Sequence, residues 1–167
     1  MPNRIWIGLV FSALLIGLGA GCGQHTVSAA VYSVDRYDPA RDAATDLAET
    51  RRLAKESDKR ILLEVGGNWC KWCRALDRFI HSTPAVGTAL RDSYIVMKVN
   101  MSEENRNEAF LSHYPRIPGY PHIFVLDSDG KLLHSEDTGL LEEGKSYSER
   151  RFLEFLAEWA PSKRQGS

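Results

Sequence analysis

The sequence predicts an α/β domain in which a central mixed β-sheet is flanked by helices. Residues 60–65 form a short, almost continuous apolar run, which is typical of a strand buried on both faces. A helix-like segment follows, and a second strand is predicted over residues 94–99. Further on, the apolar run 122–126 leads through an Asp- and Gly-containing turn into residues 131–135, which predicts an antiparallel hairpin. A βαβ half joined to a hairpin half gives a mixed sheet.

The helices are predicted from apolar stripes and from end signals. Pro39 stands in the first turn of a weakly amphipathic helix that extends to about residue 56. Residues 74–80 carry apolar side chains on one face. A capping-box pattern at 146–149 begins the last helix, and Pro161 ends it. Two further helices are predicted, over residues 84–91 and 103–113.

The size and charge of the chain fit one domain with a substantial core. The 167 residues include 21 basic and 22 acidic side chains, for a formal charge of −1. This balance gives no reason to expect a nucleic-acid partner or a strongly charged substrate. The predicted organisation is a lipoprotein-type signal peptide at 1–21, a tether at 22–38, the folded domain at 39–161 and a polar tail at 162–167.

The N-terminus predicts an exported protein. Arg4 precedes an uninterrupted apolar stretch, which small residues follow, and this is the order of a secretory leader. The segment ending in Cys22 resembles the bacterial lipobox, whose cysteine is lipidated and becomes the first mature residue. Gly19 departs from that pattern, because the family favours leucine three positions before the cysteine. Cleavage after Ala30, which would give a soluble periplasmic or secreted form, is the alternative.

Cys70 and Cys73 are separated by two residues at the end of the first predicted strand. A disulfide across so small a loop would add only about 2 kcal/mol in the chain-entropy model, so it is a poor structural brace. A zinc site would need two more ligands, and neither a second cysteine pair nor a suitable histidine spacing is present. The spacing therefore favours redox chemistry, and no metal or other cofactor is expected.

Cys70 is the predicted nucleophile. It lies at the start of a helix, where the helix dipole and free backbone N–H groups stabilise a thiolate and lower the pKa of the thiol. The positive charge of Lys71 acts in the same direction. Cys73, one turn into the helix, is predicted to resolve the mixed disulfide that Cys70 forms.

A βαβ half that carries Trp-Cys-x-x-Cys, followed by a hairpin half entered through proline, resembles the thioredoxin superfamily over about residues 41–160. The resemblance implies a thioredoxin-like fold and assigns three further positions. Pro121 matches the cis-proline beside the active disulfide. Glu64, six residues before Cys70, matches the buried acid that accepts the proton of the second cysteine, and Lys98 matches the lysine beside that acid.

The chain departs from typical thioredoxins between its two cysteines. It carries Lys71 and Trp72 there instead of Gly-Pro, a form more like that of exported or lipoprotein thioredoxin-like proteins. Trp69, Lys71 and Trp72 flank the sulfurs and are predicted to contact the substrate. The backbone of Tyr120, next to Pro121, is expected to pair with an extended substrate segment.

The predicted function is that of an exported thiol-disulfide oxidoreductase, with reduction or disulfide repair favoured over oxidation. Its expected partners are disulfide-bearing envelope proteins and a thiol electron donor or acceptor, and Cys22 would anchor it to a membrane. Two other hypotheses remain open. One is a Cu(I)-binding module that uses Cys70 and Cys73, and the other is a thioredoxin-like binding domain without catalysis.

Overall fold

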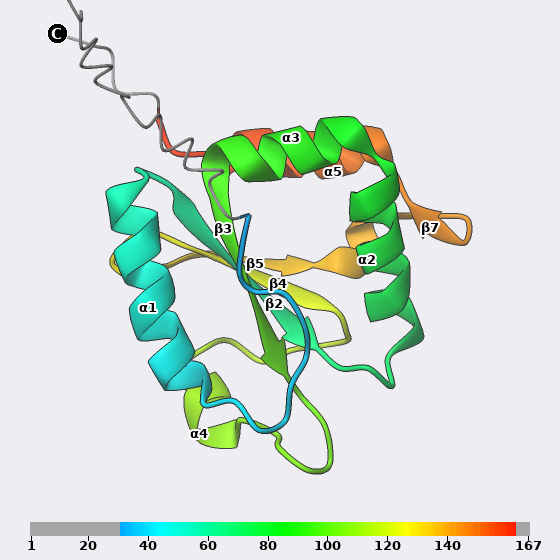
Figure 1. The fold of residues 1–167 in the computed structure, drawn as a ribbon. Helices are drawn as coiled ribbons and strands as arrows, with labels where there is room; N and C mark the ends of the chain where they lie inside the picture. The colour runs from blue at the N-terminus through cyan, green and yellow to red at the C-terminus, as the bar shows by residue number, and fades with distance from the viewer. Residues whose placement is uncertain (1–30, 163–167) are drawn as a thin grey trace, which may run out of the picture.

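The computed structural model describes residues 31–162, which form a five-stranded sheet with helices on both faces (Figure 1). The signal peptide, Cys22, the alternative cleavage site and residues 163–167 of the polar tail lie outside this part of the chain. The sheet order is β1-β3-β2-β4-β5. Its strands are β1 Tyr32–Val34, β2 Arg60–Gly66, β3 Tyr94–Asn100, β4 His122–Leu126 and β5 Leu132–Asp137.

The sheet is mixed, as predicted. Strands β1, β2 and β3 are parallel, whereas β4 runs antiparallel to β2 and β5 antiparallel to β4. The helices are α1 Ala43–Glu56, α2 Lys71–Ser82, α3 Pro84–Ser93, α4 Glu108–Leu111 and α5 Glu149–Glu158. A 3₁₀ turn, η1 (Thr138–Leu141), and a small hairpin of β6 (Glu142–Glu143) and β7 (Ser146–Tyr147) connect β5 to α5.

Successive side chains of each strand point to opposite faces of the sheet, which therefore separates two hydrophobic cores. In β2, Leu62 faces the core formed with α2, α3 and α5, whereas Ile61 and Leu63 face the core that packs beside α1. Figure 1 shows α1 on one side of the sheet and α3 with α5 on the other. With both faces covered, β2 is almost entirely buried, which explains its continuous apolar sequence. Glu64 is the acidic exception within this strand.

The N-terminal boundary of the domain requires correction. The predicted tether at 22–38 contains β1, which pairs with β3 through Tyr32 and Val34. The first helix begins at Ala43 rather than near Pro39. Asp42 caps it, because its side chain accepts a hydrogen bond from the Thr45 backbone N–H at 2.7 Å.

The helix predicted over 103–113 is reduced to the four residues of α4. Polar side chains before it bind the backbone locally and compete with a helix. Ser102 Oγ accepts from the Asn105 N–H at 3.4 Å, and Asn107 Nδ2 donates to the Asn100 carbonyl at 2.8 Å. Asn107 also has a φ of 48°, in the left-handed region, which places the helix start after it.

The last helix begins later than the capping-box pattern indicated. Ser146 pairs with Glu143 in the small hairpin, so it is not available as a cap. Ser148 occupies the N-cap position, without a side-chain capping hydrogen bond. Among residues 31–162, no helix is long and apolar enough to span a bilayer.

Candidate active site

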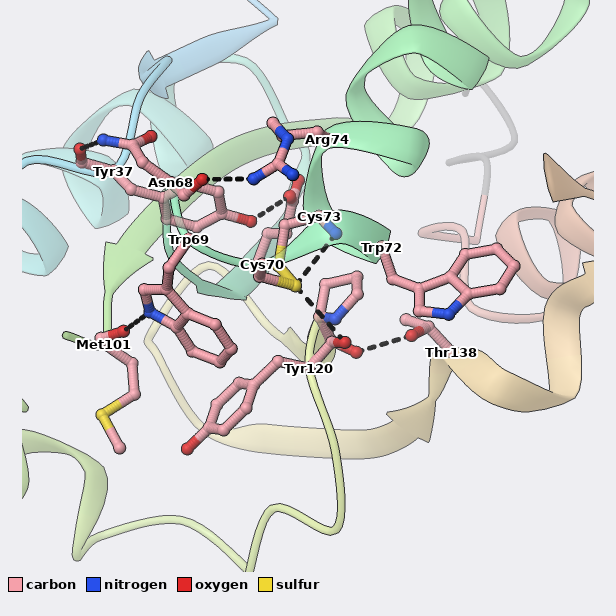
Figure 2. The surroundings of a disulfide bond; sticks show 12 residues. Tyr37, Asn68, Trp69, Cys70, Trp72, Cys73, Arg74, Met101, Tyr120 and Thr138 are labelled. Atoms are coloured by element: carbon pink, nitrogen blue, oxygen red, sulfur yellow. Dashed lines mark hydrogen bonds between the residues drawn. A yellow bond between two sulfur atoms is a disulfide. The ribbon is translucent and has the colours of Figure 1, made fainter. Parts of the chain in front are cut away.

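Cys70 and Cys73 form a disulfide at the N-terminus of α2 (Figure 2). Cys70 is the N-cap residue, and its Sγ accepts a hydrogen bond from the Cys73 backbone N–H at 3.0 Å. In the reduced protein this N–H and the positive end of the helix dipole would both stabilise a thiolate on Cys70. The end of β2, only a few residues earlier, fixes the position of this helix start.

Both cysteines are largely covered by protein. Cys70 is 4% exposed and Cys73 is 1% exposed, so their accessibilities differ little. The neighbouring side chains therefore form the surface above the sulfur of Cys70.

The segment before β4 lies against Cys70. The Tyr120–Pro121 peptide bond is cis, and the Tyr120 carbonyl oxygen lies 3.5 Å from Cys70 Sγ. Thr138 holds this segment from the other side, because its Oγ1 donates a hydrogen bond to the Pro121 carbonyl at 2.5 Å (Figure 2). The sequence did not single out Thr138, because only the path of η1 in the fold brings this residue to the Pro121 carbonyl.

Aromatic side chains flank the disulfide. Trp69 is 58% exposed, and its Nε1–H donates to the Met101 carbonyl at 2.6 Å. Its ring meets that of Tyr120 edge to face, with the ring centres 5.7 Å apart. Trp72 is half-buried against Tyr147 on the other side. Figure 2 shows Trp69 and Trp72 on opposite sides of the cysteines.

Glu64 is buried in the middle of β2, where it is 1% exposed. Burial raises the pKa of its carboxyl group, and the nearby charge of Lys98 and a hydrogen bond from Tyr37 act more weakly in the opposite direction. Tyr37 Oη donates to Glu64 Oε1, and within residues 31–162 this is the one hydrogen bond to that carboxylate. A buried acid with a raised pKa is suited to taking up a proton near neutral pH.

Lys98 takes a different partner from the one predicted. It stands opposite Glu64 in the pairing of β2 with β3, but its Nζ forms an ion pair with Asp77 Oδ1 at 2.7 Å. The Lys98 side chain is only 5% exposed and lies beside the rings of Tyr32 and Tyr37, 5.6 and 5.4 Å from their centres. Lys98 thus acts on Glu64 through its charge rather than through direct contact.

The sequence did not reveal Tyr37 or Asp77. Tyr37 precedes the first helix in a stretch without periodicity, and only the fold brings it to Glu64. Asp77 lies on α2, the helix that carries Cys73, and a position close to the active-site turn was the one available signal.

Lys71 is exposed at the start of this helix. In the part of the chain that the structure describes, no cluster of three or more His, Cys, Asp or Glu side chains could hold a metal ion.

The Cys73→Ser variant is expected to show an acidic Cys70 thiol. The backbone N–H of residue 73 would remain in place, and the helix dipole would still favour the charged form. Ultraviolet thiolate absorbance followed against pH should therefore reach half of its final value well below pH ~8.5, the ordinary value for cysteine. Unfolded protein in denaturant is the control and should titrate near the ordinary value. A folded midpoint at or above that of the unfolded protein would contradict the expectation.

Comparison with known proteins places these features in a family. A family model described as Thioredoxin-like matches residues 42–128. The chain is 29% identical, over 58% of its length, to the thiol:disulfide interchange protein DsbD of Actinobacillus pleuropneumoniae. It is 23% identical, over 95% of its length, to DsbD 2 of Pseudomonas aeruginosa. These alignments span only 17% and 27% of the respective relatives.

Solved structures agree with the fold. A disulphide isomerase from Xylella fastidiosa superposes with a TM-score of 0.63 at 29% identity, over 73% of this chain and 94% of that one. The oxidised C-terminal domain of DsbD from Neisseria meningitidis gives a TM-score of 0.55 at 22% identity, over 75% of this chain and 99% of that domain. The second likeness supports the fold alone.

Proposed function

The chain belongs to the thioredoxin-like family, and we propose that it is an exported thiol-disulfide oxidoreductase that reduces or repairs disulfides in envelope proteins. The observation that carries the proposal is the Cys70–Cys73 disulfide at the N-terminus of α2, beside the Tyr120 carbonyl. Relatives named thiol:disulfide interchange protein and disulphide isomerase support the reaction class.

The proposed reaction begins with the reduced protein. The Cys70 thiolate attacks one sulfur of a substrate disulfide, a mixed disulfide forms, and the other substrate sulfur leaves as a thiolate. Cys73 then gives up its proton, with Glu64 as the final acceptor, and its thiolate attacks Cys70 Sγ. The internal disulfide forms, the second substrate thiolate leaves, and two electrons have passed to the substrate.

The surface around Cys70 would hold the substrate during this exchange. Trp69 and Trp72 offer apolar contact on either side, and the residue before Pro121 presents backbone close to the sulfur. An extended segment can pair with such backbone by strand addition. Lys71, exposed beside Cys70, would favour substrates with acidic residues near the disulfide.

The location and partners form part of the proposal. The leader sequence is the basis for the proposed envelope location with a lipid anchor at Cys22. Cleavage after Ala30 would give a soluble form instead. Outside the cytosol thiols tend to oxidise, so a reductant there needs a thiol electron donor to regenerate Cys70 and Cys73. The proposed partners are therefore a disulfide-bearing substrate and that donor.

The reduction potential of the cysteine pair tests the direction of the reaction. Equilibration of the protein with glutathione buffers of known ratio should give a value of about −270 mV, which suits a reductant. A value of about −120 mV would assign the opposite direction, that of an oxidant. The reduced protein should also reduce insulin. Tight stoichiometric Cu(I) binding without insulin reduction would instead favour a metal-handling role.

A further inference from the structure

Tyr37 reaches the active site from outside the segment that matches the family model. It lies between β1 and α1, before residue 42, yet its side chain is buried with Cys70 and Cys73 in one cluster. Asn68 Nδ2 donates to the Tyr37 carbonyl at 3.2 Å and ties this segment to the loop before Cys70. Figure 2 shows the Tyr37 ring directed from that contact toward Cys73.

The Tyr37 hydroxyl contacts the buried acid and lies close to the resolving cysteine. It donates a hydrogen bond to Glu64 Oε1. A Cβ placed on Gly66 would lie 2.5 Å from Cys73 Sγ and 2.8 Å from Tyr37 Oη, so both atoms border the same small space above this glycine. Because Cys73 Sγ and Tyr37 Oη both lie within 2.8 Å of that one position, they are close enough for a direct contact or for one bridging water.

We propose that the Tyr37 hydroxyl relays the proton of Cys73 to Glu64 during resolution of the mixed disulfide. The Cys73 thiol transfers its proton to Tyr37 Oη while the phenol proton passes to Glu64 Oε1. The Cys73 thiolate then attacks Cys70 Sγ, the internal disulfide forms, and the substrate thiolate leaves with its electron pair. The inference rests on the proposed function and names the path that its proton takes.

The surroundings of Tyr37 favour a relay over a base. Burial, together with the negative charges of Glu64 and Asp77, raises the pKa of the Tyr37 phenol well above its ordinary value. The phenol therefore remains neutral and can accept a proton only as it donates its own. Lys98 also faces the ring, from β3, but its ammonium group is paired with Asp77.

A small pocket gives the proton a route to solvent after resolution. Its volume is about 120 Å³, and Tyr37, Cys73, Asp77 and Lys98 are among the residues that line it. Glu64 is not part of its lining. Tyr37 is the hydrogen-bond partner of the Glu64 carboxylate and also lines the pocket, so it connects the buried acid to this route.

Tyr37→Phe removes only the relaying oxygen and is the direct test. Stopped-flow measurement of the reduced protein with a fluorescent peptide disulfide separates attack by Cys70 from resolution by Cys73. Resolution should slow at least about tenfold near pH 7, because positioned proton transfer contributes about 10²–10⁴-fold, while attack stays within about twofold. The deficit should shrink as pH rises, since hydroxide can then deprotonate Cys73 directly.

Tyr94→Phe is the matched control. It also deletes a buried tyrosine hydroxyl, which donates to the Leu156 carbonyl at 2.7 Å, but Tyr94 lies at the opposite end of the sheet from the disulfide. Resolution in this variant should match that of the wild type. Equal slowing in both tyrosine variants would show a general packing effect and would overturn the relay.

A double-mutant cycle with Glu64→Gln tests whether the two residues act in one path. If they do, Tyr37→Phe should slow resolution by less than about twofold in the Glu64→Gln background. Additive losses, or a deficit that does not change with pH, would refute the relay. Unchanged resolution in Tyr37→Phe would also refute it and leave the proposed function intact, whereas wild-type protein that never forms a mixed disulfide would refute the proposed function itself.

Discussion

Cys73→Ser is expected to accumulate mixed disulfides with substrate proteins, whereas Cys70→Ser is expected to trap almost none. Cys70 is the N-cap residue of α2. In the proposed reaction Cys70 attacks the substrate disulfide and Cys73 resolves the mixed disulfide. Disulfide reduction should fall by about 10³-fold or more in Cys70→Ser, in the range seen when a covalent nucleophile is removed. Non-reducing gels and mass spectrometry of envelope extracts measure the trapped species.

The double variant Cys70→Ser/Cys73→Ser sets the background for this experiment. Bands in the Cys73→Ser sample should disappear on treatment with a reducing agent, and each should contain this chain joined through Cys70. Equal trapping by the two single variants would show that the nucleophile is wrongly assigned. An absence of trapping in both would favour the metal-binding or the non-catalytic hypothesis over exchange.

Local sequence was sufficient to predict the elements that bear the active cysteines. A continuous apolar strand followed by Cys70, Cys73 and an amphipathic helix has few arrangements open to it, and β2 and α2 form as expected. The hairpin was equally well defined. Asp127 Oδ1 accepts hydrogen bonds from the N–H groups of Asp129 and Lys131, and Gly130 takes a positive φ of 85°.

Other elements depended on contacts that are distant in sequence. Strand β1 is three residues long and has no clear alternation, so only its pairing with β3 defines it. Lys98 shows that strand register does not decide which group a side chain contacts. The sheet places Lys98 opposite Glu64, but α2 brings Asp77 to 2.7 Å from its ammonium group. A family pattern carries the register of strands and does not specify which charge the end of a flexible side chain meets.

Tyr37 shows the same effect at the candidate site. Its sequence neighbours are polar and aperiodic, which is typical of a linker. In the fold, its ring fills the space beside Gly66, where a side chain on residue 66 would otherwise stand. The small residue at 66 and the aromatic residue at 37 are thus complementary, a relation that a single sequence does not display.

Glu64→Gln is expected to slow resolution by about 10²-fold near pH 7, with little effect on attack by Cys70. The amide has almost the same shape and can still accept a hydrogen bond from Tyr37, but it cannot take up the Cys73 proton. Stopped-flow kinetics of the two steps measure the effect. Glu158→Gln, the same chemical change at an exposed position on α5, is the control and should leave both rates unchanged.

The same substitution is expected to stabilise the fold, increasingly so as pH rises. Because burial raises the pKa of Glu64 in the folded protein, the native state binds more protons than the unfolded state at pH values between the two pKa values. The contribution of Glu64 to the free energy of unfolding is therefore fully present below about pH 4.3, its unfolded pKa, and is lost as pH rises through its folded pKa. The glutamine side chain of the Glu64→Gln variant does not ionise and avoids that loss.

Guanidinium unfolding of wild type and variant at pH 4 and pH 8 should show a larger stabilisation at pH 8. If the wild type were the more stable protein at pH 8, the Glu64 carboxylate would be well compensated where it lies, and its assignment as the final proton acceptor would have to be abandoned.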